Sequence, residues 1–277
     1  MACPIKYMTF NSSCSYAGLA NMLLRFGVDT QDREIALSAM LPFLFAYEEG
    51  EYRTGPMLQS AQWFNLYLHP RGLSICEKKL PAGEVAAYLR RQRTAMLGLH
   101  GLGSGKHAVV YVGSEQEKLL FINNKREHSD VPAQLILTPE ELTARMDDTA
   151  MVAVLERIPP CETDIADRMR RSLPVLRQNT AEICALCEGK TTAAALRGQL
   201  DRLFRALLLD GITMLELLEE QALAAQLRPL QQGLLRAVRQ KANAPVCLRD
   251  YLPPDALTAA AAAYARRIEA EIDQYAH

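Results

Sequence analysis

Cys14, His107 and Asn123 have the residue types that covalent acyl chemistry requires. A thiolate can attack an acyl carbon, an imidazole can take up the thiol proton, and a carboxamide can hold the imidazole in one tautomer by accepting its other N–H. Asn124 offers the same carboxamide one position later. The sequence therefore predicts a Cys-His-Asn site in which either Asn123 or Asn124 is the third member.

A helix start is predicted to carry the thiol. The polar residues at 11–13 are of types that cap helix N-termini, and a broad apolar surface follows as far as Phe26, before Gly27 as a plausible stop. A thiol in the first turn feels the positive end of the helix dipole, which favours the thiolate. Free cysteines are more often small buried hydrophobes, so Cys14 gains its functional interpretation only together with the histidine.

A hairpin is predicted to carry the other two groups. His107 begins a β-branched apolar run over 107–113, and a second strand over 119–122 ends at the two asparagines. His100 ends the preceding strand, at 95–100. We prefer His107, because an apolar strand and then a carboxamide-ended strand follow it.

The glycine-rich link between these two histidines, residues 101–105, resembles a phosphate loop in composition. It joins two strands and has no following helix whose N–H groups could hold an anion. We therefore interpret it as a flexible approach to His107.

Residues 13–23 (Ser-Cys-Ser-Tyr-Ala-Gly-Leu-Ala-Asn-Met-Leu), with Phe-Gly at 26–27 and Leu-Pro-Phe-Leu-Phe at 41–45, carry a family resemblance. Within the papain-like superfamily of cysteine peptidases, they resemble the N-terminal domain of the butirosin-biosynthesis acyltransferase family (BtrH). More distantly, they are similar to the bacteriocin-leader peptidases. The resemblance covers about residues 8–156. It implies a bacterial protein that acts through a cysteine nucleophile on a small acyl or peptide substrate.

The chain departs from this pattern at two places. Papain-like and leader peptidases carry a glutamine about six residues before the nucleophile, and Met8 stands there in this chain. Leader peptidases have Asp where this chain has Asn. With the glutamine missing, we expect the backbone N–H of Cys14 to be one oxyanion donor, and the side chain of Asn11 or the hydroxyl of Ser13 to be the other.

An α+β fold in two domains is predicted. Residues 1–158 form a papain-like domain, in which the N-terminal helix packs on an antiparallel sheet, and residues 159–277 form an α-helical bundle. Ile158-Pro159-Pro160 marks the boundary. The expected strands include 73–79, 95–100, 107–113, 119–122, 131–137 and 151–155, and the expected later helices are 162–177, 179–188, 191–209, 212–225, 227–242 and 254–275.

Composition excludes several classes of partner and cofactor. The 31 basic and 32 acidic residues balance, which argues against a nucleic-acid partner. No stretch has the apolar length of a membrane span or the pattern of a signal peptide, so we expect no membrane association and a cytoplasmic location. The seven scattered cysteines suggest no disulfide framework, and the Cys184–Cys187 pair lacks further ligands at zinc spacing. We therefore expect neither metal nor cofactor.

Three functions stay open at this point. Water as acceptor would make the protein a peptidase or amidase, and an amine would make it an acyltransferase, with the helical domain completing an acceptor or carrier-protein site. The missing glutamine also allows a papain-like scaffold whose chemistry has lapsed and which acts as a binding module. The sequence predicts no oligomeric state.

Overall fold

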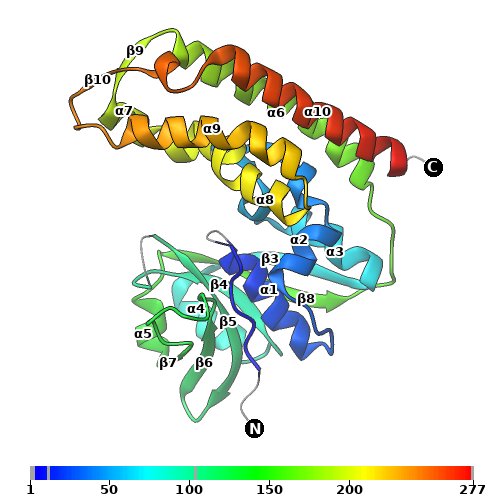
Figure 1. The fold of residues 1–277 in the computed structure, drawn as a ribbon. Coiled ribbons are helices and arrows are strands. Elements are labelled where there is room, and N and C mark those ends of the chain that lie inside the picture. The colour runs from blue at the N-terminus through cyan, green and yellow to red at the C-terminus, as the bar shows by residue number, and fades with distance from the viewer. Residues whose placement is uncertain (1–3, 11–12, 103–104, 276–277) are drawn as a thin grey trace. The chain divides into compact units, whose positions relative to one another are not determined.

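The computed structural model describes residues 4–10, 13–102 and 105–275. The chain divides into two compact units, each of which we describe by itself (Figure 1). The first unit comprises residues 1–39 and 59–163, and the second comprises 40–58 and 164–277.

A six-stranded antiparallel sheet forms the centre of the first unit, in the order β3-β8-β4-β5-β6-β7. All six predicted strands are confirmed. The strands are β3 (Leu73–Pro81), β4 (Ala95–Leu99), β5 (His107–Glu115), β6 (Lys118–Asn123), β7 (Gln134–Leu137) and β8 (Thr149–Arg157), and the helices are α1 (Cys14–Arg25), α2 (Asp32–Ser38), α3 (Ala61–Leu68), α4 (Ala82–Leu89) and α5 (Pro139–Thr143).

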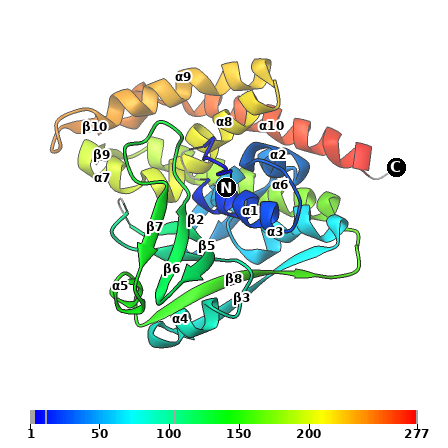
Figure 2. The ribbon, with the colours of Figure 1, turned by 90° about the horizontal axis from the view of Figure 1, so that it is seen from below.

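The two faces of this sheet are covered differently. One face forms an apolar core with α4 and α5, and its central members are Leu97, Val109, Tyr111, Phe121, Val85 and Leu142. The other face receives α1, which packs on β4 and β5 (Figure 2). The expected N-terminal helix on an antiparallel sheet is therefore confirmed.

Gly18 lets α1 approach the sheet closely. A Cβ at this position would lie only 2.6 Å from Asn124 Nδ2 and from Met96 Sδ. On another side of α1, the ring of Tyr16 stands edge-on to Phe64 of α3, with centroids 4.9 Å apart. Neighbours surround the helix, so its residues from Ser15 to Leu23 are all buried, the polar Ser15 and Asn21 included.

Helices dominate the second unit. They are α6 (Ile165–Cys187), α7 (Ala193–Gly198), α8 (Gly211–Leu217), α9 (Gln221–Val238) and α10 (Pro254–Tyr275), with two π-helical segments, Leu200–Phe204 and Ala206–Asp210. The helices predicted at 162–177 and 179–188 are one helix, α6. At the predicted break, Thr180 Oγ1 donates to the carbonyl of Leu176 one turn back, 2.8 Å away, so the side chain folds onto its own helix.

The second unit is not entirely helical. Residues 45–54 form a hairpin of β1 (Phe45–Glu48) and β2 (Glu51–Thr54). Its turn residues Glu49 and Gly50 both have positive φ, as a two-residue hairpin turn requires. A short ladder also joins β9 (Lys190–Thr192) to β10 (Pro245–Cys247).

The second unit also includes residues 40–58, which the sequence division at 158 assigned to the first part. Tyr264 Oη donates to the carbonyl of Pro42, and Tyr52 Oη donates to Glu182, 2.5 Å away. The Phe45 ring lies 5.3 Å from that of Tyr264. These contacts hold the segment among helices that follow it by more than a hundred residues.

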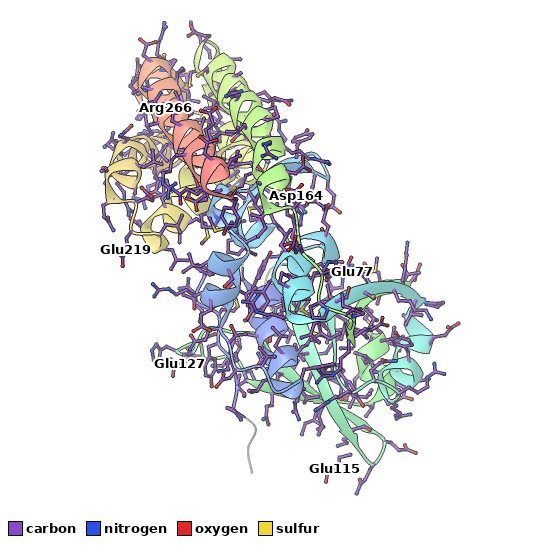
Figure 3. All side chains as sticks on the ribbon, turned by 90° about the vertical axis from the view of Figure 1, so that its right-hand side faces the viewer. Glu77, Glu115, Glu127, Asp164, Glu219 and Arg266 are labelled. Atoms are coloured by element: carbon purple, nitrogen blue, oxygen red, sulfur yellow. The ribbon has the colours of Figure 1, made fainter. Side chains whose placement is uncertain are left out.

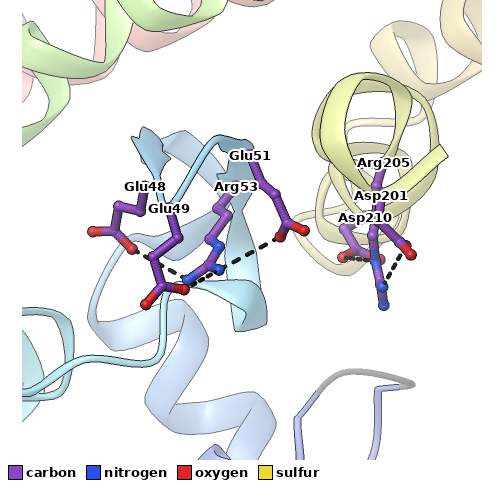
Figure 4. Close-up of polar contacts among 7 residues, drawn as sticks. All are labelled: Glu48, Glu49, Glu51, Arg53, Asp201, Arg205 and Asp210. Carbon is purple, nitrogen blue, oxygen red and sulfur yellow. Dashed lines mark hydrogen bonds and ion pairs between the residues drawn. The ribbon is translucent and has the colours of Figure 1, made fainter. Parts of the chain in front are cut away.

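The second unit contains two separate groups of ion pairs, one on the hairpin and one on the π-helical segments (Figure 4). Arg53 lies within 4 Å of three carboxylates, those of Glu48, Glu49 and Glu51. Separately, Arg205 pairs with Asp201 and with Asp210. Burial raises the pKa of Asp210, and the Arg205 guanidinium opposes that shift.

Among the described residues, no helix combines the length and apolar character needed to cross a membrane.

Candidate active site

Cys14 is the first residue of α1 and is partly exposed. Ser13 is the N-cap residue, but its side chain makes no capping hydrogen bond to the helix. Cys14 therefore stands at the positive end of the helix dipole with no capping side chain beside it. Within the described chain, Cys14 Sγ has no hydrogen-bond partner.

A buried carboxylate holds the segment that leads into Cys14. Asp32, the first residue of α2, is fully buried. It accepts hydrogen bonds from Thr9 N at 2.7 Å, from Thr9 Oγ1 at 2.6 Å and from Ser13 Oγ at 2.6 Å. From its local sequence an acidic residue at a helix start looks solvent-exposed, so the burial of Asp32 becomes visible only in the fold.

The hydrogen bonds of Asp32 involve one of the two expected oxyanion donors, Ser13. The Ser13 hydroxyl is fully buried and engaged with Asp32, and it also accepts from Phe10 N at 3.2 Å. The structure thus gives no support to a second task for Ser13 as an oxyanion donor. Asn11 lies outside the described residues.

His107 is the first residue of β5 and pairs with Leu99 of β4. Burial, the largest cause, lowers the pKa of His107, while the Asn124 backbone and the Asn123 side chain act in the opposite direction. The net lowering keeps the imidazole neutral at pH 7, which is the state that a general base needs.

The register of β5 and β6 separates the two asparagines. Asn123 lies opposite Val109, so its side chain shares a sheet face with those of Val109 and His107. Asn124 projects from the other face. There Asn124 Nδ2 donates to Ala108 O at 3.0 Å, and its Oδ1 accepts from Asn21 Nδ2 of α1 at 3.1 Å. The Asn124 side chain therefore fastens α1 to the sheet.

Two complementary atoms stand unsatisfied on the His107 face. Asn123 Nδ2 donates to Pro132 O at 2.8 Å, which leaves its carboxamide oxygen as the free end. Asn123 Oδ1 and His107 Nε2 are both buried and have no hydrogen-bond partner among the described residues. Buried polar atoms normally pair, and an imidazole N–H with a carboxamide oxygen would satisfy both.

The other histidine of the sheet belongs to a surface cluster. His100 Nε2 lies 2.9 Å from Asp147 Oδ1, and Lys106 contacts the second oxygen of the same carboxylate. These contacts give His100 a partner of its own and favour His107 as the functional histidine.

No hydrogen bond joins Cys14 Sγ to His107 in the described structure. Both residues begin elements that pack on each other, α1 and β5, but His107 shares the sheet face of Val109, whereas α1 lies against the opposite face, with Val110 and Asn124. The catalytic contact between them therefore stays a prediction.

A hollow of about 460 Å³ lies between the segment that precedes α1 and the segment that follows β6. Met8 and Thr9 form one wall, and residues 126–129, which follow the two asparagines, form the other. Thr9 shares the Asp32 carboxylate with Ser13, the neighbour of Cys14. Each wall of the hollow is thus formed by a segment that is close in the chain to a candidate catalytic residue.

The thiol pair of α6 consists of the part-exposed Cys184 and the buried Cys187. Burial raises the pKa of Cys187 to about 12, with the neighbouring Cys184 adding to the shift. Such a thiol stays protonated at neutral pH. The described residues contain no cluster of three or more side chains that could hold a metal ion.

No protein-family model matches this chain, and no curated protein matches it. Among solved structures, the chain is similar to the peptidase domain of Streptococcus ComA, a bifunctional ABC transporter involved in a quorum-sensing pathway. The identity is 11%, the match covers 54% of this chain and 96% of that chain, and the TM-score is 0.39. We draw no functional conclusion from a superposition this loose, and the resemblance to the butirosin acyltransferase family stays a prediction.

Proposed function

We propose that this protein performs thiol-dependent acyl chemistry, with Cys14 as nucleophile, His107 as general base and Asn123 as the residue that orients His107. The observation that carries the proposal is the pair of unsatisfied, buried atoms His107 Nε2 and Asn123 Oδ1 on one sheet face. A hydrogen bond between them would fix the tautomer and leave His107 Nδ1 to accept the thiol proton.

The reaction follows from these roles. The Cys14 sulfur attacks an acyl carbon as its proton passes to His107, and the leaving group then takes that proton, which leaves an acyl-thioenzyme. Water or an amine attacks this intermediate, and the Cys14 thiol is restored. The backbone N–H of Cys14 serves as one oxyanion donor.

The substrate is a small acyl compound or a peptide, which is what the sequence resemblance implies. The hollow between Thr9 and residues 126–129 is where one side of such a substrate would lie. A carrier protein as acyl donor belongs to the same proposal. Incubation with acyl thioesters and an amine separates transfer from hydrolysis, because a peptidase would cleave peptides and ignore the amine.

Selective alkylation tests the nucleophile. With limiting iodoacetamide near pH 6, Cys14 should react about tenfold faster than the exposed Cys161, because only an activated thiol is appreciably ionised there. Peptide mass spectrometry identifies the modified residue. His107→Ala should remove the preference and His100→Ala should retain it. Slow labelling of Cys14 in the unaltered protein would refute the proposal.

The second candidate is a binding module without chemistry. It is favoured by the absence of a hydrogen-bond partner for Cys14 Sγ in the described structure and by Met8 in the place of a glutamine. This candidate predicts equal labelling of Cys14 and Cys161, and no effect of His107→Ala on either.

A further inference from the structure

We propose that the groove between α6 and α10 binds an aliphatic carboxylate. The groove has a volume of about 480 Å³, within the range of about 300–1,000 Å³ typical of small-molecule sites. It lies entirely within the second unit, and its floor is apolar, formed by Leu176, Ala181, Ala261, Ala262 and Ala265.

Small side chains open this groove. The helices α6 and α10 run along each other and lie side by side in Figure 1. Residues 259–263 of α10 are all alanine, a run that the proposed catalytic chemistry leaves without a role. Ala261 and Ala262 of this run line the groove, and their small side chains leave room there for a hydrocarbon chain.

Charge at one end selects the ligand. Arg177 of α6 pairs with Glu269 of α10 at 2.9 Å, so these two charges cancel. Arg266, labelled on α10 in Figure 3, is exposed and has no carboxylate partner among the described residues. This end of the groove therefore carries one uncompensated positive charge, and a guanidinium matches a carboxylate in geometry.

The opposite end is uncharged. Cys184 Sγ and Thr258 Oγ1 lie there, 3.7 Å apart. Arg177 and Cys184 are two turns apart on α6, which corresponds to about 10 Å along the helix. A carboxylate at the arginine end with a chain of medium length, such as decanoate, would bring its methyl end to Cys184. The site is independent of the proposed reaction at Cys14.

Cys184 serves as the reporter in the test. The full chain is treated with N-ethylmaleimide at rising decanoate concentration, kept below the micellar range, and the rates at Cys184, Cys161 and Cys247 are followed by peptide mass spectrometry. At ten times its Kd, decanoate should slow labelling of Cys184 about tenfold by mass action. Labelling of the exposed Cys161 and Cys247 should not change.

Three comparisons make the test specific. Decyltrimethylammonium, with the same chain and the opposite charge, should not protect Cys184. Arg266→Gln should raise the protecting concentration of decanoate several-fold, while Arg170→Gln, an exposed arginine outside the groove, should leave it unchanged. Ala181→Leu should fill the groove and remove protection, with circular dichroism confirming that the variant is folded.

Failure of decanoate to protect Cys184 would overturn the proposal. So would equal protection by the cationic amphiphile, which would indicate an apolar groove without charge selection, and so would equal slowing at Cys161, which would indicate a general surfactant effect. A groove that accepts an amphipathic helix in place of a carboxylate would give the first of these results.

Discussion

His107 is the residue whose environment most directly links structure to chemistry. Its pKa is lowered because the ring is withdrawn from water, and the Asn123 side chain and Asn124 backbone recover part of that shift. These two asparagine groups raise the pKa and partly offset the effect of burial, so the imidazole is better able to take a proton than burial alone would allow.

The lowered pKa predicts how stability depends on pH. The unfolded chain, in which histidine has a pKa of about 6.5, binds this proton more readily than the folded one. The contribution of His107 to stability is therefore present above about pH 6.5 and is lost as the pH falls below that value. Urea denaturation near pH 7.5 and near pH 5 should show a smaller difference in free energy of unfolding for His107→Gln than for the unaltered protein. An unchanged difference would contradict the shift.

Asp32 is predicted to be a strong stability determinant. Asp32→Ala removes the acceptor of the buried Ser13 hydroxyl and of the Thr9 hydroxyl and N–H, and an unpaired buried group costs about 1–3 kcal/mol of stability. The expected loss, measured by urea denaturation, is thus at least about 2 kcal/mol. Asp29→Ala is the matched control, because the Asp29 side chain is 77% exposed and its ion pair with Lys6 should contribute under about 1 kcal/mol. A similar loss in the two variants would refute this account.

At the scale of elements, the seating of α1 on the sheet decides where Cys14 lies. Because neighbours pack against α1 on all sides, its position on the sheet is fixed. The contacts of Gly18 and Asn124 set the distance of α1 from β4 and β5. Any change that lifts α1 should therefore affect both stability and the thiol.

Gly18→Ala tests this seating. The added methyl would meet Asn124 Nδ2 and Met96 Sδ at 2.6 Å, and overpacking of this kind costs about 1–3 kcal/mol. Gly83→Ala in α4 has open space around it and should stabilise by about 0.5–1 kcal/mol, because alanine is the better helix former. Thermal unfolding measures both. The close approach of α1 would be refuted if Gly18→Ala were as well tolerated as Gly83→Ala.

At the scale of the whole molecule, the spatial units are not made of consecutive parts of the chain. The second unit takes residues 40–58 from the middle of the first part, and these residues supply Phe43, Phe45 and Tyr52 to its interior. The helices that follow residue 158 therefore do not form a complete core by themselves.

A fragment test follows from this arrangement. Residues 159–277 alone should give a broad, weakly cooperative thermal transition, because the Tyr264 hydroxyl loses its Pro42 carbonyl and buried aromatic partners are missing. Residues 40–58 joined by a flexible linker to 164–277 should restore a sharp transition. Cooperative unfolding of the 159–277 fragment would show that the segment is dispensable.

The sequence by itself determined the six strands of the sheet, the start of α1 and the change to helices after residue 158. Apolar periodicity, glycine and proline punctuation and helix-start residues are local signals, so each could be read without knowledge of the neighbours in space. The same local view identified Cys14, His107 and the two asparagines as candidates.

The tertiary structure decided which asparagine faces His107, that Asp32 is buried and that residues 40–58 join the second unit. Side chains alternate along a strand, so a difference of one position moves Asn124 to the α1 face, and only strand pairing shows which face each residue shares. The partners of Asp32 lie 19 and 23 residues away in the chain, and those of residues 40–58 lie more than a hundred away. Such contacts depend on the three-dimensional packing of distant segments, which no local pattern encodes.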